Sequence, residues 1–456
     1  MEFVSIDPSD GAELARRPAL AAAARDAVLA HASDAQRAWA LVPLAARAAT
    51  LARVGIALRD HAERLAETAT AEIGKRSAEA RAEVEKSARA CDHYAALALL
   101  ELADREVAST APRSLLVAQP LGVVLAIEPW NFPYWQALRV IAPALAVGNG
   151  VVLKPAPSVA GCAQALAEAL RAAGLPPGLV EVALLDDAGC AAAIADRRIA
   201  AVTLTGSARA GRAVGAAAGR ALKKCVLELG GADPFVVLAD ADLAASVVGA
   251  VQGRFQNCGQ SCIAAKRFIV VEAIADEFAT RFAAVAGALR SGAPRDPNTE
   301  LGPMARRDLR DALHAQVEDA LGHGARALTG GRWPDGPGAW YPPTVLDGVT
   351  PAMRAWREEL FGPVASVVRV RDAAEALRVA NGSDYGLGGS VWTCDAAAGE
   401  RFARELACGM AFVNGVVHSD PRLPFGGVKG SGFGRELGSA GLHEFVNLKS
   451  LWLGPA

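Results

Sequence analysis

One cysteine stands in a setting suited to nucleophilic chemistry: Cys262, in residues 255–263 (FQNCGQSCI). A thiol reacts as its thiolate and is mostly protonated at neutral pH, so its surroundings must supply a base or positive potential. Lys266 and Arg267 follow closely, and Gly259 lets the backbone pass near a substrate. Taken alone, the segment favours a small packed core thiol. Three distant segments, described below, shift the interpretation from a packed thiol toward a nucleophile.

A carboxylate, Glu228, lies inside the apolar stretch of residues 225–231 (CVLELGG). Among Val and Leu its charge must be satisfied or its pKa raised, and a raised pKa suits a general base. The alternative is a Glu on the solvated face of a strand. Glu228 lies 34 positions before Cys262 (262 minus 228), so only the fold can bring the two together.

Asn131 lies between two prolines in residues 128–133 (EPWNFP), directly after the apolar run 123–127. That run is typical of a strand buried on both faces, and open parallel sheets bind ligands at the carboxyl ends of their strands. Asn131 is therefore either a turn-forming residue, which the residues alone favour, or an amide donor to a developing oxyanion.

Two further strand ends carry groups that suit a nucleotide. Lys154 ends the run 151–153, where it is either a contact to a ribose or phosphate or a solvated strand terminus. Gly206 and Ser207 end the run 201–205 and open a helix, whose free N–H groups suit an anion. The GxGxxG fingerprint is absent, so the phosphate signal is moderate. Glu359 and Phe361 suit ribose hydroxyls and a planar ring, or simply a helix end.

The remaining pattern predicts an α/β protein. Residues 19–105, rich in Ala, Leu, Arg and Glu, predict several long amphipathic helices, and the Ala richness is only a helix signal. Later strands and helices alternate in both halves, which indicates two units with parallel sheets. Strands are predicted at residues 114–118, 123–127, 151–153, 180–185, 201–205, 267–271, 364–370, 386–392, 410–414 and 444–453, and helices at 141–150 (with a closing turn), 159–173, 274–289, 309–321 and 375–380.

Composition narrows the function classes. The 456 residues exceed one ordinary core, and 52% are apolar, as in a globular protein of two or three domains. Lys and Arg number 47 against 49 Asp and Glu without blocks of one sign, so nucleic acid and membrane are not expected partners. No apolar run is long enough for a bilayer, and the first ten residues lack a signal pattern.

The spacing of the cysteines and histidines argues against a disulfide-stabilised protein and against a metalloprotein. Eight cysteines at irregular spacing do not form a disulfide framework, so we expect a reduced, cytoplasmic protein. No CxxC pair and no HExxH occurs, so no metal site is expected.

Assembled in order, these segments resemble the NAD(P)-dependent aldehyde dehydrogenase superfamily along nearly the whole chain, and most of all its shorter bacterial succinate-semialdehyde dehydrogenases. Each motif is weak by itself, but seven in one order are very specific. They are residues 129–133 (PWNFP), 154–155 (KP), 205–207 (TGS), 227–231 (LELGG), 259–262 (GQSC), 358–363 (EELFGP) and 424–427 (PFGG).

The resemblance implies an aldehyde dehydrogenase-like fold with two Rossmann-like domains and a small oligomerisation sheet. The cofactor-binding domain would comprise residues 1–101 and 120–228, and the catalytic domain residues 229–438. The hairpin 102–119 and the tail 439–456 would form the oligomerisation sheet of a homodimer or homotetramer. The apolar tail agrees with this, since an exposed strand edge usually pairs with something.

The resemblance also implies a reaction. Cys262 would attack a small-molecule aldehyde to give a thiohemiacetal, whose oxyanion takes hydrogen bonds from the Asn131 amide and the Cys262 N–H. Hydride transfer would leave a thioester, and Glu228 would activate the water that hydrolyses it.

For the cofactor, the resemblance assigns Gly206 and Ser207 to the pyrophosphate. Glu359 and Phe361 would lie at the nicotinamide end, and Lys154 would reach the adenosine ribose. Trp130 is a further residue of the implied cofactor site. Many NAD-using relatives place a Glu three residues after the lysine, where this chain has Pro157. Without that carboxylate nothing there repels a 2′-phosphate, so we expect NADP to be accepted at least as well as NAD.

For the substrate, Arg139 and Ser419 match contacts to the distal carboxylate of a semialdehyde. The alternative for Arg139 is a salt bridge on a helix surface. A second arginine of many relatives is Gln256 here, which leaves glutarate semialdehyde and aliphatic aldehydes open as substrates. Cys258, four residues before Cys262, is either a packed thiol or a reversible disulfide partner.

Two other classes of function remain to be weighed. A cofactor-independent thiol hydrolase would use Cys262 and Glu228 but leaves the nucleotide-type residues without a purpose. A non-catalytic binding protein of this fold is expected to lose Cys262 or Glu228, and this chain keeps both.

Overall fold

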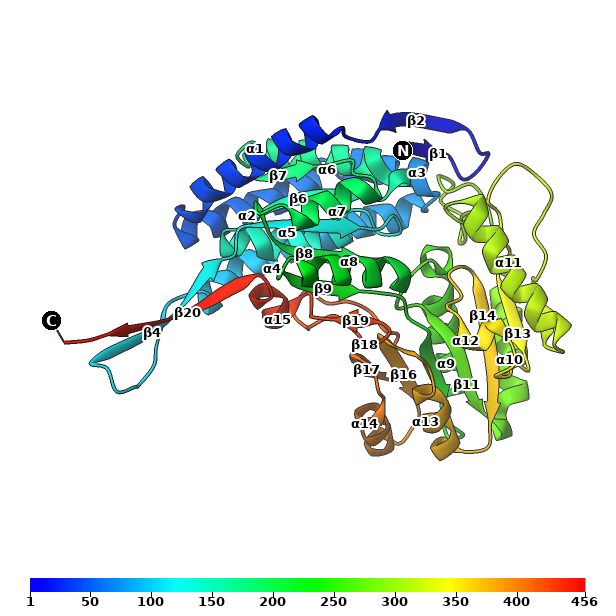
Figure 1. Ribbon diagram of the computed structural model, residues 1–456. Helices are drawn as coiled ribbons and strands as arrows, with labels where there is room; N and C mark the ends of the chain where they lie inside the picture. The colour runs from blue at the N-terminus through cyan, green and yellow to red at the C-terminus, as the bar shows by residue number, and fades with distance from the viewer. Residues whose placement is uncertain (456) are drawn as a thin grey trace.

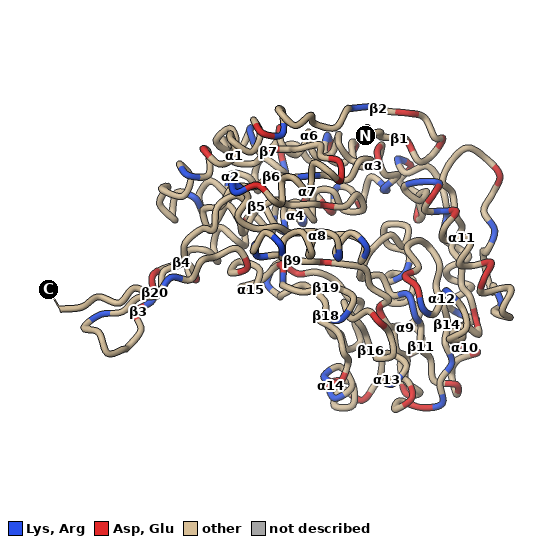
Figure 2. The backbone as a smooth tube through the Cα atoms, viewed as in Figure 1, with Lys and Arg blue, Asp and Glu red and all other residues tan. Residues whose placement is uncertain are grey.

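The structure is a computed structural model that describes residues 1–455. Two large sheets, each with helices packed against it, form the upper left and lower right parts of the molecule, and a thin arm of strands projects away from them (Figure 1). Lys and Arg are interspersed with Asp and Glu along both parts (Figure 2), as expected from a sequence without blocks of one sign.

The first part begins with a strand hairpin and four helices. The hairpin consists of β1 (Glu2–Ile6) and β2 (Glu13–Pro18). The helices are α1 (Ala22–Ala40), α2 (Leu44–Asp60), α3 (Ala62–Ile73) and α4 (Ser77–Glu101). Helix α4 packs against α2, α3 and α5 on one face of the first large sheet. Helix α1 instead contacts β6 and α7 and contributes Leu29 and Ala32 to the core on the other face, so the predicted amphipathic helices cover both faces.

The first large sheet has six strands in the order β19-β9-β8-β5-β6-β7. All are parallel except β19, which runs antiparallel to β9. The strands are β5 (Val123–Glu128), β6 (Gly150–Pro155), β7 (Val180–Val182), β8 (Ile199–Thr205), β9 (Lys224–Glu228) and β19 (Gly432–Phe433). The connecting helices are α5 (Trp135–Val147), the short 3-10 helix η1 (Pro157–Val159), α6 (Ala160–Ala172), α7 (Asp187–Ala195) and α8 (Ala208–Arg220).

The second large sheet has seven strands in the order β12-β13-β14-β11-β10-β16-β17, parallel except for β12. They are β10 (Asp233–Val237), β11 (Ala265–Val271), β12 (Arg326–Thr329), β13 (Thr344–Asp347), β14 (Val364–Val370), β16 (Gly388–Trp392) and β17 (Met410–Val413). Around it lie α9 (Leu243–Phe255), the 3-10 turn η2 (Gln256–Gly259), α10 (Glu272–Gly287), α11 (Arg307–Gly322), α12 (Arg354–Arg357), α13 (Ala373–Asn381) and α14 (Ala396–Glu405).

The projecting arm is a three-stranded sheet in the order β20-β4-β3. It joins β3 (Arg105–Glu106) and β4 (Arg113–Pro120) to the C-terminal strand β20 (Val446–Leu453), and β20 pairs with β4 along its whole length. Before it come the small pair β15 (Tyr385–Gly386) and β18 (Val428–Lys429), and helix α15 (Gly438–His443).

The structure confirms the predicted α/β class, with two parallel-sheet units and a small third sheet. The residue boundaries of the three domains stay a prediction. One strand crosses the expected division, because β19 comes from the glycine-rich segment near the C-terminus yet pairs with β9 of the first sheet. Among the described residues, no helix is long and apolar enough to cross a membrane.

Three local predictions differ from the structure. The N-terminal hairpin was not expected, because its alternating residues are short and rich in charge. Strand β7 ends at Val182 instead of continuing to Leu185. Helix α5 begins at Trp135, six residues before the predicted start, and all thirteen of its residues are buried. A helix buried on every side has no amphipathic period that would mark its first turn.

Candidate active site

A tight reversal of the chain presents Cys262. Helix α9 ends at Phe255, and Asn257 and Cys258 then adopt left-handed backbone angles with φ of 53° and 54°. Gly259 follows with φ +68°, and a Cβ there would lie 2.3 Å from the carbonyl oxygen of Gly362. Only glycine fits such a position without strain. The reversal places Cys262 just before the amino-terminal end of β11, the central strand of the second sheet.

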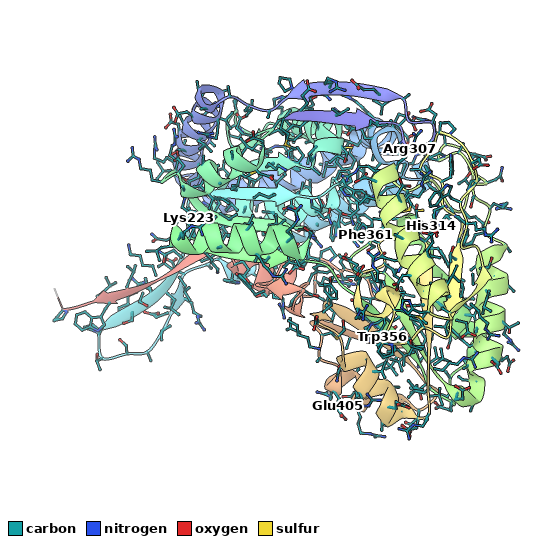
Figure 3. All side chains as sticks on the ribbon, turned by 45° about the vertical axis from the view of Figure 1, so that its right-hand side comes forward. Lys223, Arg307, His314, Trp356, Phe361 and Glu405 are labelled. Atoms are coloured by element: carbon teal, nitrogen blue, oxygen red, sulfur yellow. The ribbon has the colours of Figure 1, made fainter. Side chains whose placement is uncertain are left out.

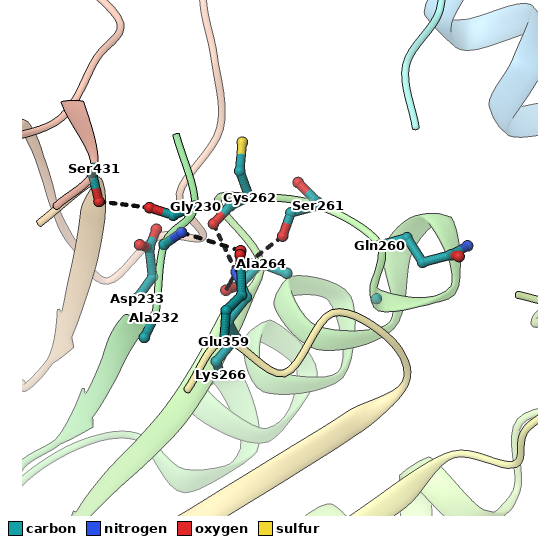
Figure 4. Close-up of polar contacts among 12 residues, drawn as sticks. Gly230, Ala232, Asp233, Gln260, Ser261, Cys262, Ala264, Lys266, Glu359 and Ser431 are labelled. Carbon is teal, nitrogen blue, oxygen red and sulfur yellow. Dashed lines mark hydrogen bonds and ion pairs between the residues drawn. The ribbon is translucent and has the colours of Figure 1, made fainter. Parts of the chain in front are cut away.

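Lys266 holds this loop from beneath. Its Nζ donates to the carbonyl oxygens of Ser261 at 3.0 Å and Cys262 at 2.7 Å, and it lies 3.3 Å from the carboxylate of Glu359. Figure 4 shows the ammonium below the loop and the thiol of Cys262 pointing to the opposite side. Lys266 therefore fixes the backbone of the nucleophile and brings positive charge near it. Arg267 instead donates to distant backbone carbonyls, such as that of Ala232.

The surroundings of the Cys262 thiol favour its protonated form. Burial raises its pKa to about 12, and the nearby charges of Arg139 and Lys266 act in the opposite direction. A base or a change of surroundings on ligand binding must therefore remove the proton before the sulfur can attack.

Asn131 lies beside this loop, although 129 positions separate it from Gln260. Its Nδ2 donates to the carbonyl oxygen of Gln260 at 3.0 Å, and the Asn257 amide donates to the backbone carbonyls of both Asn131 and Gln260. The Asn131 amide carries two hydrogens, so one remains for a developing oxyanion. The structure thus joins the strand-end loop after β5 to the cysteine loop.

Glu228 ends β9 and is 2% exposed. Burial, together with the charge of Glu436, raises its pKa well above the ordinary value. Neither of its carboxylate oxygens has a hydrogen-bond partner among the described residues. A Cβ on Gly426 would lie 2.6 Å from its Oε1, so the glycine-rich segment packs directly against this carboxylate. Such a group suits a general base that takes up one proton.

Arg139 lies on α5 and is buried, with an exposure of 2%. Its Nε lies 2.7 Å from Oε2 of Glu436, and its guanidinium sits 4.6 Å from the ring centroid of Phe425. The salt bridge considered from the sequence exists, but in the interior and not on a helix surface. Because Glu436 already balances its charge, the assignment of Arg139 to a substrate carboxylate stays a prediction.

The groups expected near the nicotinamide lie together. The rings of Trp130 and Phe361 meet edge to face, with centroids 5.7 Å apart. Figure 3 shows Phe361 where the two large parts of the molecule meet. Glu359 accepts a hydrogen bond from the N–H of Gly231 at 3.1 Å, beside Lys266.

The groups expected at the phosphates and the adenosine lie at the carboxyl ends of β8 and β6. Ser207 caps α8, accepting from the N–H of Ala210 at 3.3 Å. A Cβ at Gly206 would meet no atom nearer than 3.9 Å, so the backbone there is open to a ligand. Lys154 lies 5.8 Å from the ring of Phe3 in the N-terminal hairpin. An open glycine at a helix N-terminus fits a dinucleotide pyrophosphate.

A cavity of about 240 Å³ opens beside the thiol. Its wall combines Cys262, Arg139, Ser419 and Phe425 with residues of α4, above all Lys86. The Nζ of Lys86 donates to Oγ of Ser419 at 2.7 Å and lies 4.4 Å from the Trp135 ring centroid. The sequence pattern of the Ala-rich helices did not single out Lys86. One lysine in an Ala-rich helix gives no signal of what the fold places opposite it.

Cys258 lies apart from this cavity. It is buried in the core of the second part, and burial raises the pKa of its thiol. All eight cysteines are free, so the structure supports the packed-thiol alternative, and a redox partnership with Cys262 stays untested.

Comparison with known proteins agrees with this geometry. The model of the aldehyde dehydrogenase family matches residues 1–451. A protein of Escherichia coli K12 named as an NAD(P)-dependent succinate semialdehyde dehydrogenase is 50% identical over 98% of this chain and 97% of its own. A Mycobacterium tuberculosis protein named as an NADP-dependent succinate-semialdehyde dehydrogenase is 44% identical over 99% of this chain and 100% of its own.

Solved structures agree as well. The succinic semialdehyde dehydrogenase of Streptococcus pyogenes, solved in complex with NADP, superposes with a TM-score of 0.97 at 35% identity, covering 99% of this chain and 100% of its own. Gox0499, a protein studied for its cofactor and substrate selection, superposes with a TM-score of 0.98 at 38% identity over the full length of both chains.

Proposed function

Because the chain belongs to the aldehyde dehydrogenase family, we propose that it oxidises succinate semialdehyde to succinate with NADP or NAD. The observation that carries the proposal is the cavity in which Cys262 shares one wall with the Lys86–Ser419 pair. A nucleophile for an aldehyde and a cationic site for a carboxylate line the same small space. The names of the relatives in Escherichia coli and Mycobacterium tuberculosis support the same substrate.

Acylation begins at Cys262. Once the thiol has lost its proton, the sulfur attacks the aldehyde carbon and forms a thiohemiacetal. The free hydrogen of the Asn131 amide and the Cys262 N–H stabilise the oxygen that becomes negative. One such donor contributes about 3 kcal/mol to the transition state. Lys266 and the Gln260 carbonyl position these donors through the contacts described above.

Deacylation depends on Glu228. A bound nicotinamide would supply the hydride acceptor, and loss of the hydride from the former aldehyde carbon would leave a thioester on Cys262. Glu228 then takes one proton from a water molecule, whose oxygen attacks the thioester carbon, and the sulfur departs. The raised pKa of Glu228 makes it a stronger base than an exposed glutamate, once it is ionised.

The cofactor site supports dual use with NADP at least as good as NAD. Trp130, Glu359 and Phe361 would hold the nicotinamide end, Gly206 and Ser207 the pyrophosphate, and Lys154 the adenosine ribose. Pro157 opens η1 where a carboxylate would repel a 2′-phosphate. Lys154 can attract that phosphate instead.

We further propose a cytoplasmic homodimer or homotetramer. The arm strand β20 leaves Leu448 and Trp452 exposed at 59% and 60%. Apolar side chains on a projecting sheet usually mark a protein interface. Eight free cysteines suit a reducing compartment. A small-molecule aldehyde is the only partner besides the cofactor in this proposal.

Product analysis tests the proposed reaction. The protein should convert succinate semialdehyde to succinate with one reduced cofactor per succinate, as measured by mass spectrometry and absorbance. Cys262→Ser should lose both products at once. Hydrolysis of an activated ester without any cofactor reduction by aldehydes would instead support the thiol-hydrolase alternative.

A further inference from the structure

The charged groups around the substrate cavity are unequally paired. Among the acids, Glu83 pairs with Lys75 and Glu79 pairs with Arg76 at 3.1 Å. Glu83 also accepts from the backbone N–H groups of Tyr134 and Trp135 at 2.8 and 3.0 Å. The acidic residues of the wall are thus already neutralised from outside the cavity.

The cations divide differently. Arg139 has Glu436 as its counter-charge, and Arg89 reaches solvent with its side chain 64% exposed, 4.0 Å from Glu85. Lys86 has no carboxylate within ion-pair distance among residues 1–455. Its ammonium rests on the Trp135 ring and donates to the hydroxyl of Ser419, which is itself 7% exposed. The cavity therefore carries one positive charge without an internal partner.

We infer that Lys86 is the specificity residue that recognises the distal carboxylate of the substrate, with Ser419 as its partner. The inference rests on the proposed function and extends it to a named anchor. The Ser419 oxygen accepts from Lys86, so its own hydrogen is free to donate to a carboxylate oxygen. Ammonium and hydroxyl together offer two donors to one carboxylate.

Two neighbouring positions explain why the anchor lies on α4. Arg139 is held by Glu436 and by the Phe425 ring, so a substrate would compete with a buried ion pair for its guanidinium. Gln256, which also lines the cavity, is neutral and offers an amide only. Lys86 is half-buried, and a cation taken partly out of water without a counter-charge is costly, so an anionic substrate would supply the missing charge.

The surroundings of Lys86 are consistent with an anion-binding site, because they disfavour its charged form when no anion is bound. Burial lowers its pKa to about 8, and the nearby charge of Arg139 acts in the same direction. The other charged groups that face it are Glu83 and Arg89 on α4 and Asp420 beside Ser419. A bound carboxylate would favour the charged form of Lys86.

The chemistry defines the substrate class as short aldehydes with a single negative charge at the far end. The cavity of about 240 Å³ limits the length of the chain between the two groups. Neutral aldehydes of the same length would enter the cavity but would leave Lys86 without a partner.

Steady-state kinetics on Lys86→Met tests the inference, with succinate semialdehyde and butanal as matched charged and neutral substrates. Met keeps the length and the apolar contact with Trp135 but removes the charge. We expect KM for succinate semialdehyde to rise about thirty-fold, as for loss of one charge-assisted hydrogen bond, with kcat changed less than about three-fold and butanal unaffected. Lys86→Arg should recover most of the lost affinity.

Arg81→Met is the control, because Arg81 is exposed on the same helix, pairs with Glu63 and lies outside the cavity. It should leave both substrates unchanged. If Lys86→Met keeps the wild-type preference for succinate semialdehyde, or loses both substrates equally without rescue in Lys86→Arg, the anchor is not Lys86. If the wild type itself shows no preference for the charged aldehyde, the proposed substrate fails, whatever the variants do.

Discussion

At the scale of single residues, the acid–base chemistry depends on three buried carboxyl groups that share one nearby arginine. Arg139 lies among Glu128, Glu228 and Glu436, and its ion pair is with Glu436. Burial raises the pKa of all three carboxyls. Glu228 is therefore ionised only well above the pH at which an exposed glutamate ionises, and base-catalysed hydrolysis of the thioester should slow as the pH falls through that raised pKa.

Glu228→Gln should separate the two halves of the reaction. The amide cannot accept a proton, whereas Cys262 can still attack and pass its hydride on. We expect a burst of one reduced cofactor per active site, followed by turnover reduced at least about a hundred-fold, the effect typical of losing a general base. Rapid-mixing absorbance measures the burst. A slow reaction without a burst would show that Glu228 is needed before the thioester forms.

Lys86 predicts a pH dependence of specificity. Its pKa is lowered to about 8, so in the free enzyme the charged form dominates below that pH and is lost above it. The ratio of kcat/KM for succinate semialdehyde to that for butanal should therefore fall as the pH rises through about 8. Taking the ratio removes the titrations of Cys262 and Glu228, which both substrates share. Well above that pKa, the ratio should fall by roughly ten-fold per pH unit at most, because one ionisable group controls it. A ratio that does not change with pH between about 7 and 10 would contradict the role of Lys86.

At the scale of elements, the turn after α9 decides where the nucleophile stands. Gly259→Ala should disrupt it, because the added Cβ would meet the Gly362 carbonyl at 2.3 Å and the backbone is left-handed. We expect a loss of at least about 2 kcal/mol in unfolding free energy and a large fall in kcat.

Gly174→Ala is the matched control, since φ is +82° there and nothing lies within 4 Å of the added Cβ. It should cost about 1 kcal/mol through backbone strain alone and leave kcat unchanged. Chemical denaturation and initial rates measure both variants. Equal effects of the two substitutions would mean that the close contact at Gly259 does not hold the loop.

Sequence patterns identified most elements and failed for specific physical reasons. The buried strands β5, β8 and β14 are continuous apolar runs and were predicted within two residues of their observed ends. Helix α5 was predicted to start too late, because burial on all sides removes its amphipathic period. Lys86 and Glu436 gave no signal, since their roles arise from partners hundreds of positions away or on other elements.

At the scale of the whole molecule, the arm of β3, β4 and β20 has too little core to stand alone. Three strands that expose Leu448, Trp452 and Leu453 fit a surface covered by another copy of the chain. The double variant Leu448→Asp with Trp452→Asp should lower the molar mass measured by light scattering.

Leu41→Asp, at a highly exposed position directly after α1, is the control and should leave the mass unchanged. A monomeric wild type would contradict the proposed homo-oligomer. An unchanged mass in the double variant would place the interface elsewhere.

The motifs of the candidate site could largely be predicted from the sequence. The pairing of its buried charges could not. Cys262, Asn131 and Glu228 carry motif signals, and the structure brings the loop of Asn131 against the loop of Cys262. Whether Arg139 is free or paired depends on Glu436, almost three hundred positions later in the chain. Pairing of this kind follows from the tertiary fold and not from local spacing.

The most direct measurement of the central claim is the initial rate of cofactor reduction over a panel of aldehydes. The panel contains succinate semialdehyde, glutarate semialdehyde, hexanal and benzaldehyde, each with NADP and with NAD. We predict a kcat/KM for succinate semialdehyde at least about ten-fold above that for hexanal, the ratio equivalent to 1.4 kcal/mol, with NADP no worse than NAD. A flat profile across the panel would contradict a cavity built for an anionic aldehyde.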